Sequence, residues 1–533
     1  MKNVTELNLG FIDAENYQRK ENKDLFNLIF VRNAFLDDLL KPSTFFLIGE
    51  KGTGKTAYSV YLSNNEYKEN IAELKYIRET DYNKFVKLKE NKQLELSDYC
   101  SIWKVIILLL LAKSIKTEEL ENNIFSKGNK IRALWRAIDE YYLNAFSPEI
   151  ISVLNMIENS KLAAEIFSKY LTLGGEETLS SNFQESRFQV NLFYIQKQFE
   201  NAISDLKLKK NHLLLIDGID IRPGSIPYKE YLECVKGLAN AIWSLNNDFF
   251  ANIKDSQGRF RAVLLARPDI FNSIGMQNQT NKIHDNSVFL DWRTTYPNYR
   301  NSDLFGLIDK LLNAQQDKTN ILLHGEAWDY YFPWKSSSTN PDNRDFDPSF
   351  CNFLKLSYSR PRDIVTMVQI LQEEFKEKKH KATDVFTTTL LYSHEFQNKY
   401  SEYLMGGIKD QLSFYYDSTD YNTFLKFFNF LDRKSEFSYI EYVDAYNKFS
   451  DYLTTPGVHI PEFMENQDSF LQFLYDTNIL CFMEDANFDR YFSWCYRERT
   501  PSNLSPKVKP NVSYRIHQGL HKTLNVGRTV RGK

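Results

Sequence analysis

Short apolar runs recur through the first part of the chain, each bounded by turn-forming or charged residues. Their length and composition are typical of buried strands rather than of helices. The predicted strands are Phe45–Ile48, Leu74–Arg78, His212–Asp217, Ala262–Ala266 and Val288–Leu290.

Apolar residues at helical spacing fill most of the segments between these runs and most of the chain after them. The predicted helices include Lys23–Leu40, Tyr99–Lys113, Arg187–Leu206, one that starts at Ser302 and one that follows Asp363. The stretch 117–188 is long for a connection, so we predict an inserted helical subdomain. Its expected core positions are Trp135, Ile138, Tyr142, Leu143 and Leu154. The clearest loop is Ser336–Asn343, which is rich in helix-breaking residues.

The first predicted strand runs directly into a glycine-rich segment with the pattern GxxxxGK[ST]. Its residues are Gly49, Glu50, Lys51, Gly52, Thr53, Gly54, Lys55 and Thr56. Glycines let such a backbone fold around a phosphate with its N–H groups pointing inward, at the positive end of the following helix. Lys55 would reach the β- and γ-phosphates, and the Thr56 hydroxyl would bind Mg²⁺. The segment therefore predicts a nucleotide site, with ATP or ADP as the ligand.

A magnesium-dependent site of this kind needs a second strand that ends in a carboxylate. Asp217 ends the predicted strand His212–Asp217, and Asp220 follows three residues later. We predict that Asp217 binds the metal beside Thr56 and that Asp220 orients or deprotonates the attacking water. The alternative is an ordinary turn aspartate after a buried strand.

Two arginines are further candidates for contact with the nucleotide. Arg267 follows the strand Ala262–Ala266, where its planar guanidinium would reach a γ-phosphate. Arg362 precedes an amphipathic helix and would touch the nucleotide from a lid. The alternatives are a surface arginine before a proline turn for Arg267 and a solvated loop for Arg362.

Together these segments resemble an AAA+-type ATPase module of the STAND and origin-recognition kind. The phosphate loop, Asp217-Gly218-Ile219-Asp220, Arg267-Pro268 and Arg360-Pro361-Arg362 occur in that family's order. The segments Leu9–Glu15 and Ile516–Lys522 also resemble an uncharacterised family of bacterial P-loop ATPases with the same layout. The resemblance covers roughly residues 5–375 well and the remainder loosely.

The resemblance implies an α/β fold in which a five-stranded parallel sheet lies between helices. It also implies that Arg267 acts as sensor 1 and Arg362 as sensor 2, and it raises the hypothesis of a role in bacterial anti-phage defence. Two departures bear on mechanism. Many AAA+ ATPases have Glu directly after the metal-binding Asp, where this chain has Gly218, so we expect slow hydrolysis. Between Pro268 and Leu290 the only cation besides His284 is Lys282, so the usual place of a trans-acting arginine is empty; Arg293 and Arg300 follow. This favours a switch over a processive motor.

Beyond residue 400 the pattern predicts three helices and a strand pair, the order of a winged-helix domain. The helices are Tyr421–Leu431, Tyr439–Leu453 and Asp468–Tyr475, and the strands are Ile479–Met483 and Tyr491–Tyr496. Phosphate contacts need Lys or Arg on the third helix and the wing, but that helix has none and the wing turn is mostly acidic. Packing against the ATPase or a partner protein is therefore favoured over DNA binding.

The predicted domain organisation follows from these segments. It comprises a lead-in helix (1–40), the ATPase core (41–300, with the insert at 117–188), a helical lid (301–400), the winged helix (401–500) and a basic tail (501–533). The tail has seven basic residues and no acidic one, which keeps nucleic-acid binding open, although a solvated end would look the same.

Composition changes this picture little. The chain has 533 residues, 42% of them hydrophobic and 25% charged, with a net charge of −3. These values are typical of a globular protein of several domains. A net charge this close to zero creates no long-range electrostatic attraction for nucleic acid or an anionic membrane. The aromatic content of 15% is high and fits large helical cores. Five scattered cysteines and the lack of a signal-like N-terminus or a membrane-length apolar run predict a cytoplasmic location.

The functional prediction is an ATP-binding, slowly hydrolysing AAA+/STAND-like switch that holds or recruits a partner protein. One alternative is an ATP-dependent, DNA-binding winged-helix initiator or regulator. Another is an inactive ATPase fold that serves as a scaffold. The sequence contains no nucleophile triad or nuclease carboxylate cluster, so any effector chemistry would come from the partner.

Overall fold

The computed structural model describes residues 1–77, 96–120, 130, 132–138, 185–222, 226–317, 322–337, 346–377, 384–416, 418–455, 457, 460–486 and 489–527. It forms two compact units, which interleave along the sequence. Unit 1 comprises Met1–Asn33, Glu50–Gly54 and Leu290–Lys533, and unit 2 comprises Ala34–Gly49 and Lys55–Phe289.

Unit 2 contains an all-parallel, five-stranded sheet with the strand order β2-β3-β4-β1-β5. The strands are β1 (Phe46–Ile48), β2 (Asn70–Tyr76), β3 (Asn211–Asp217), β4 (Phe260–Ala266) and β5 (Ser287–Phe289). The five predicted strands and the α/β class are confirmed. The second strand begins and ends earlier than predicted, because Asn70 to Tyr76 pair with the full length of β3.

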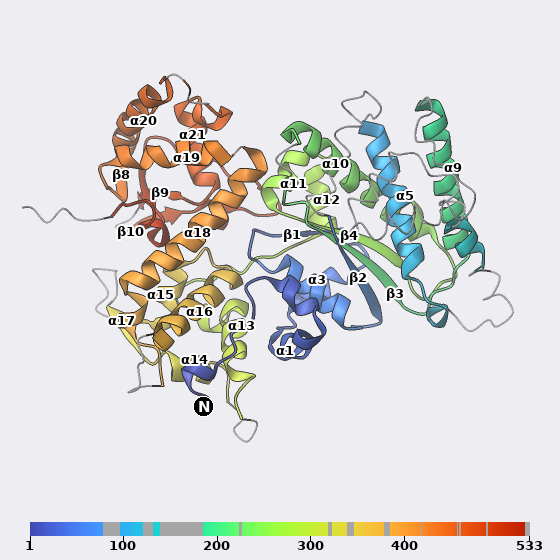
Figure 1. Cartoon of the computed structure of the whole chain (residues 1–533), viewed down its shortest axis with the longest axis horizontal. Helices are drawn as coiled ribbons and strands as arrows, with labels where there is room; N and C mark the ends of the chain where they lie inside the picture. Colours follow the sequence, from blue (N-terminus) through green and yellow to red (C-terminus); the bar gives the residue numbers. More distant parts are fainter. Residues whose placement is uncertain are drawn as a thin grey trace, which may run out of the picture. The chain divides into compact units, whose positions relative to one another are not determined.

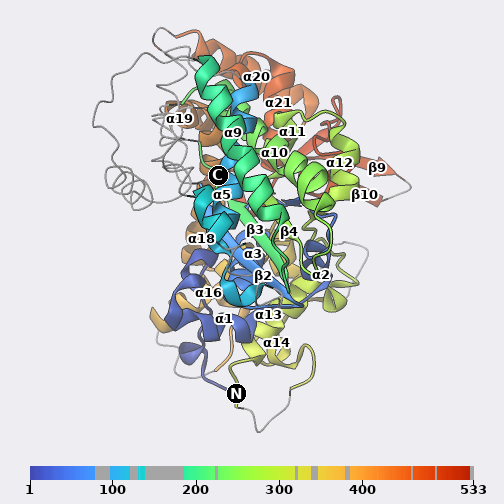
Figure 2. The same ribbon diagram turned by 90° about the vertical axis from the view of Figure 1, so that its right-hand side faces the viewer.

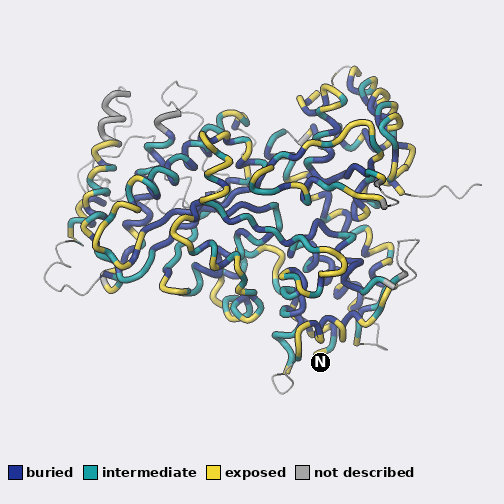
Figure 3. The backbone as a smooth tube through the Cα atoms, turned by 180° about the vertical axis from the view of Figure 1, so that it is seen from behind, coloured by how far each residue is buried: buried dark blue, intermediate teal, exposed yellow. Residues whose placement is uncertain are grey.

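The inner strands are apolar over most of their length, with polar residues such as Arg261 near their ends, because helices cover both faces of the sheet. Every residue of β1 and β4 is buried (Figure 3). A strand buried on both faces is selected for continuous rather than alternating hydrophobicity, which is the pattern that the sequence displays. Since all five strands run in one direction, their carboxyl ends meet at one edge of the sheet, where ligands of open α/β sheets bind.

The helices of unit 2 lie on both faces of this sheet. Helices α5 and α10 cover one face, with α9 packed against α5, and α3 lies on the other face (Figures 1 and 2). The helices are α2 (Ala34–Leu39), α3 (Lys55–Asn64), α5 (Leu96–Ser114), α9 (Glu185–Ser204), α10 (Tyr228–Ser244), α11 (Pro268–Ile274) and α12 (Gln279–Asn286). The apolar run Val105–Ala112 is buried within α5, as predicted. In the described part of the chain, no helix has the length and apolar character required to cross a membrane.

Most of the predicted insert, 117–188, lies outside the described residues, and so do Tyr142, Leu143 and Leu154. Of the other two expected core positions, Ile138 is buried but Trp135 is 53% exposed. The prediction for Trp135 is wrong, because residue type alone marked it as a core position and its side chain is largely exposed.

Unit 1 begins with short helical turns and α1 (Lys23–Ile29). The predicted single helix Lys23–Leu40 is wrong, because Phe30 adopts an extended conformation that ends α1, and α2 begins at Ala34.

A helical layer follows in unit 1. It consists of α13 (Asp303–Asn313), α14 (Glu326–Tyr331), α15 (Ser349–Leu356), α16 (Pro361–Glu377), α17 (Thr388–Leu391) and α18 (His394–Tyr415). The expected loop Ser336–Asn343 begins inside the strand β6 (Lys335–Ser337), which pairs with β7 (Phe346–Pro348); residues 338–343 are outside the described part.

The C-terminal part of unit 1 packs three helices on an antiparallel sheet with the strand order β10-β9-β11-β8. Its elements are α19 (Ser418–Lys426), a 3₁₀ turn (Phe427–Leu431), β8 (Glu436–Ser438), α20 (Tyr439–Leu453), α21 (Gln467–Asp476), β9 (Leu480–Ala486), β10 (Asp489–Ser493), α22 (Cys495–Glu498) and β11 (Ser513–Ile516). The predicted helices and hairpin are present. Tyr496, predicted in a strand, lies instead in α22. The helix-spaced Phe424, Phe427 and Phe428 are buried with Phe449 and Phe470 in an aromatic core, as the aromatic content predicted.

Candidate functional site

The glycine-rich segment Gly49–Thr56 connects β1 to α3 at the carboxyl edge of the sheet. Gly52 and Gly54 have φ values of +91° and +97°, in the left-handed region that glycine adopts without strain. Thr53 stabilises the turn, because its backbone N–H and its hydroxyl both donate to the Glu50 carbonyl, at 3.2 and 2.8 Å. Gly52 and Gly54 therefore lie where the backbone conformation requires glycine.

Thr56 and Asp217 meet at this edge although 161 residues separate them in sequence. The Thr56 hydroxyl donates to Asp217 Oδ2 at 2.6 Å, and the Gly218 N–H donates to Oδ1 at 2.7 Å. Burial raises the pKa of Asp217, and nearby Asp220 adds to the effect, while the hydrogen bond from Thr56 opposes it. A buried carboxylate next to a hydroxyl oxygen is a donor set suited to Mg²⁺, whose charge would offset the cost of burial.

Lys55 is almost fully buried, with 7% of its side chain exposed. Its ammonium donates to the Gly49 carbonyl at 2.8 Å and lies 3.5 Å from Asp220 Oδ2. The other oxygen of Asp220, Oδ1, is buried and has no hydrogen-bond partner among the described residues. The predicted group Lys55, Thr56, Asp217 and Asp220 thus converges at one place, and Asp220 retains an acceptor that a water molecule can use.

Gly218 takes the place that Glu occupies in many AAA+ ATPases, and the backbone explains why. Its φ is +94°, and a Cβ atom there would lie 2.5 Å from the Ile77 carbonyl oxygen. Any side chain at this position would collide with the backbone after β2. The chain therefore has no room for a catalytic carboxylate directly after Asp217.

Arg267 lies at the carboxyl end of β4, the strand between β1 and β3, as predicted. It is buried, and its guanidinium makes two hydrogen bonds to the Asp269 carboxylate at 3.0 and 2.7 Å. The alternative of a surface arginine is wrong. The bidentate pair holds the guanidinium in a fixed orientation at the carboxyl edge of the sheet.

Within unit 1, the loop segment Glu50–Gly54 is held by residues that are distant in sequence. Arg360 donates to the Lys51 carbonyl at 2.9 Å, the Arg362 N–H donates to the Gly52 carbonyl at 3.3 Å, and Trp292 Nε1 donates to the Thr53 carbonyl at 2.8 Å. A Cβ atom on Gly52 would lie 3.2 Å from Arg362 Cβ. Arg362 therefore packs on the loop, and its contact with a nucleotide stays a prediction. No sequence pattern predicts a contact between Trp292 and this loop, and Arg360 belongs only to the Arg360-Pro361-Arg362 segment of the family resemblance.

The side chains of Glu50 and Lys51 are also engaged within unit 1. Arg499 forms an ion pair with Glu50 at 2.5 Å, and Lys51 forms one with Asp410 of α18. Neither partner was predicted, because no local pattern links positions so far apart in sequence.

The two arginines considered as trans-acting candidates are already paired. Arg293 binds Asp291, and Arg300 makes two hydrogen bonds to Asp329. Lys282 packs over the Trp243 ring at 4.4 Å.

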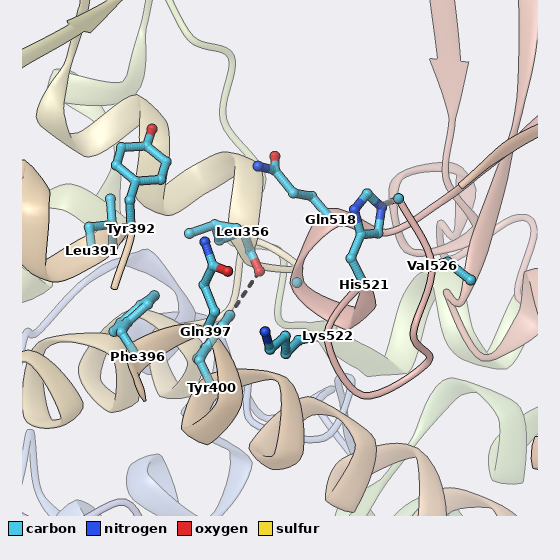
Figure 4. A pocket seen from close by; sticks show the side chains of 12 residues that line it. Leu356, Leu391, Tyr392, Phe396, Gln397, Tyr400, Gln518, His521, Lys522 and Val526 are labelled. Atoms are coloured by element: carbon cyan, nitrogen blue, oxygen red, sulfur yellow. Dashed lines mark hydrogen bonds between the residues drawn. The ribbon is translucent and has the colours of Figure 1, made fainter. Parts of the chain in front are cut away.

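The segment Ile516–Lys522 forms one wall of a separate pocket in unit 1, with a volume of about 260 Å³ (Figure 4). The opposite wall contains Tyr400, whose hydroxyl donates to the Leu356 carbonyl at 3.0 Å. His517 is buried against Tyr358 and Trp494. Among the described residues there is no cluster of His, Cys, Asp or Glu that could hold a metal ion by itself.

Comparison of the chain with protein-family models, with curated proteins and with solved structures gives no match.

Proposed function

We propose that this protein is an ATP-binding, slowly hydrolysing switch of the AAA+/STAND type. The observation that carries the proposal is the 2.6 Å hydrogen bond between Thr56 and Asp217, with Lys55 beside them at the carboxyl edge of a parallel sheet. A chance glycine turn would not bring a strand-end carboxylate from 161 residues away to the hydroxyl that follows the lysine.

Each residue has a role in this proposal. Thr56 and Asp217 would bind Mg²⁺, which neutralises β- and γ-phosphate oxygens when it is bound. Lys55 would exchange the Gly49 carbonyl for phosphate oxygens. Asp220 would accept a proton from the attacking water or orient it, because it is the carboxylate nearest to the lysine and has an unpartnered oxygen.

Slow turnover is expected for two reasons. Gly218 excludes a carboxylate directly after Asp217, so the base stands three residues away. Arg267 is paired with Asp269, so contact with a γ-phosphate as sensor 1 requires that pair to open or to share its donors. A slow ATPase suits a switch, in which nucleotide acts through its differential affinity for two conformations.

The contacts of Glu50–Thr53 in unit 1 support the switching role. Any movement of this loop around a nucleotide must alter its bonds to Arg360 and Arg362 of the lid and to Arg499. The C-terminal elements have the helix-helix-helix-hairpin order of a winged helix, which we propose holds or recruits a partner protein. A cytoplasmic location and a role in anti-phage defence belong to the same proposal and rest on composition and on the family resemblance.

DNA binding through the winged helix is less well supported. Helix α21 carries Asp468 and no Lys or Arg. Cations around the hairpin are paired with acids: Lys509 with Glu484, Arg515 with Glu436 and Arg490 with Asp485. Phosphate contacts would have to replace these pairs. DNA binding that weakens steeply with salt would favour this alternative.

The direct test compares Thr56→Ser and Thr56→Val in the purified chain. Serine keeps the hydroxyl that binds Mg²⁺ and Asp217, whereas valine keeps only the shape. We expect the serine variant to retain magnesium-dependent ATP binding and turnover and the valine variant to lose turnover by about 10-fold or more. Absence of magnesium-dependent ATP binding in the unaltered protein would refute the proposal. Mass spectrometry of co-purifying proteins tests the partner separately.

A further inference from the structure

A second pocket in unit 2 lies at the opposite edge of the same sheet. Its walls include Asn70, Asn211 and Phe260, the first residues of β2, β3 and β4, and its volume is about 260 Å³. Because the strands are parallel, these residues lie at the far ends from Asp217 and Arg267. Seven residues of strand, the length of β3, span about 20 Å. The pocket is therefore distinct from the phosphate-loop site.

Arg261 of β4 lines this pocket as a buried cation without an acidic partner. The side chain is buried, and burial lowers its pKa to about 10. It donates to the backbone carbonyls of Lys41 and, at 3.4 Å, of Thr44, and these are its only acceptors in the described part of the chain. Burying a guanidinium is costly unless an opposite charge accompanies it. Since no acidic side chain of the described residues pairs with Arg261, we infer that an anionic ligand supplies the negative charge.

Two other polar side chains of the pocket, Arg259 and Asn247, also favour an anionic ligand. Arg259 lies at its exposed rim, and the described chain offers its side chain no ion pair. Asn247 places a buried side-chain N–H₂ donor, with no partner in the described residues, on another wall. No aspartate or glutamate is among the residues that line the pocket. Glu119 lies 3.5 Å from the ring of His212, which also lines the pocket. Among the described residues, no ion pair joins an acid to Arg259 or Arg261.

The wall that carries Asn247 is a π-helical segment, Leu245–Phe249, a geometry that is rare and often found at functional sites. Asn246 fixes this segment to β4, because its side chain donates to the Ala262 carbonyl at 2.8 Å and accepts from the Ala262 N–H at 3.0 Å. Phe250 and Phe260, with ring centroids 5.9 Å apart, add an apolar surface. The pocket thus combines hydrogen-bond donors on a wall that is held in place with an apolar surface that can contact the carbon skeleton of a ligand.

We propose that this pocket binds a small phosphate-bearing molecule of about the size of a sugar phosphate. Arg261 and Arg259 bind the phosphate, Asn247 donates a further hydrogen bond, and Phe250 and Phe260 contact the carbon skeleton. A phosphomonoester dianion offsets both guanidinium charges, and the planar fork of arginine suits phosphate oxygens. A monocarboxylate would leave one of the two charges without a partner.

Titration calorimetry on the full-length chain tests this with inorganic phosphate, glycerol 3-phosphate, ribose 5-phosphate and, as a carboxylate, acetate. Each titration is run on the unaltered protein and on Lys55→Ala, so that binding at the phosphate loop is recognised by its loss in the variant. We expect phosphomonoester binding to persist in Lys55→Ala and to exceed that of acetate at least 10-fold. Inorganic phosphate that binds as tightly as the esters would assign the site to free phosphate and would overturn the role of the phenylalanines.

The matched variants are Arg259→Gln and Arg490→Gln, which each remove one exposed arginine. Arg259→Gln should weaken phosphomonoester binding at least 10-fold with thermal stability unchanged, whereas Arg490→Gln should leave binding as it is. Asn247→Leu provides a second variant at the pocket and should also weaken binding. The proposal is overturned if no phosphomonoester binds at millimolar concentration, or if binding is the same in Arg259→Gln and Asn247→Leu as in the unaltered chain.

Discussion

Arg499 Nη1 lies 2.5 Å from Glu50 Oε1, so an ion pair joins the glycine-rich loop Gly49–Thr56 to a residue 449 positions away. The Arg499 side chain is 3% exposed, and that of Glu50 is 19% exposed. The remaining donors of Arg499 bind the carbonyls of Leu504 and Asp476, both at 3.2 Å. The guanidinium is therefore fixed by its own surroundings and in turn fixes the second residue of the loop. The conformation of the loop depends on the segment that follows α22.

We predict that Arg499→Ala destabilises the protein by about 2–3 kcal/mol, because it leaves Glu50 half-buried without its cation. Glu50→Gln in the Arg499→Ala background should recover part of that loss, since the uncompensated charge is then absent. Chemical unfolding of the two single variants and the double variant measures the coupling. The control is Arg490→Ala, whose partner Asp485 is exposed and whose loss should cost less than about 1 kcal/mol. Strictly additive effects of the Arg499 and Glu50 substitutions would show that the pair is not coupled.

Lys55→Ala should reduce ATP affinity by roughly 10- to 100-fold, since a hydrogen bond to a charged group contributes about 1.5–3 kcal/mol. Fluorescent-nucleotide titration measures the effect. Lys448→Ala removes an exposed lysine of α20 and is the matched control. Thermal unfolding verifies that the Lys55 variant is folded, because that side chain is buried. Unchanged affinity in a folded Lys55→Ala protein would mean that nucleotide binds elsewhere.

Asp217→Asn and Asp220→Asn should separate metal binding from base catalysis. Asp217→Asn removes a charge from the metal site, so magnesium should no longer strengthen ATP binding. Asp220→Asn should retain magnesium-dependent binding but lower turnover by about 100-fold or more, the range of a general base. Equilibrium binding with and without Mg²⁺, beside steady-state turnover, distinguishes the two. Full turnover in Asp220→Asn would assign the base to another residue.

The unit 2 part of the site was predictable because its determinants are local. The glycine-rich motif lies within one short segment, and the carboxyl ends of parallel strands meet at one edge, so Thr56 and Asp217 could be paired from strand assignments alone. Lys55 and Asp220 follow from the same two segments. Arg267 was placed correctly at a strand end, but its pairing with Asp269 depends on side-chain orientation, which the pattern does not encode.

The unit 1 contacts were not predictable for the opposite reason. Trp292 and Arg499 reach the loop from positions that share no periodicity or motif with it, so only the tertiary fold brings them there. The errors have a similar origin. Residue type alone marks Trp135 as a core position, yet its side chain is largely exposed. The helix expected through Phe30 ends there because the Phe30 backbone adopts an extended conformation. Burial and backbone direction at such positions are set by packing rather than by local composition.

Gly218→Ala should destabilise the protein by roughly 1–3 kcal/mol, because a Cβ atom would meet the Ile77 carbonyl and φ at +94° is strained for alanine. Gly406→Ala is the matched control. Gly406 lies within α18 with open space around the added methyl group, so alanine there should stabilise by about 0.5–1 kcal/mol. Urea unfolding of both variants provides the comparison. Equal effects of the two substitutions would contradict the strained geometry assigned to Gly218.

His517 should make stability depend on pH below neutrality. Burial lowers its pKa to about 3 from 6.5, so between these values the folded protein binds fewer protons than the unfolded chain. Stability should therefore fall as the pH decreases through this window, by about 2 kcal/mol between pH 7 and pH 5 from this group.

In the unaltered chain the Gly519 N–H donates to His517 Nδ1 at 3.2 Å. His517→Asn keeps an acceptor for this N–H but cannot take up a proton. The variant should be less stable at pH 7, since it loses packing on Tyr358 and Trp494, yet its unfolding free energy should change less with pH. His284→Asn replaces a histidine with 76% of its side chain exposed and should leave the slope as it is. Urea unfolding at pH 7 and pH 5 measures all three proteins, and equal slopes for the unaltered chain and His517→Asn would show that another group is responsible.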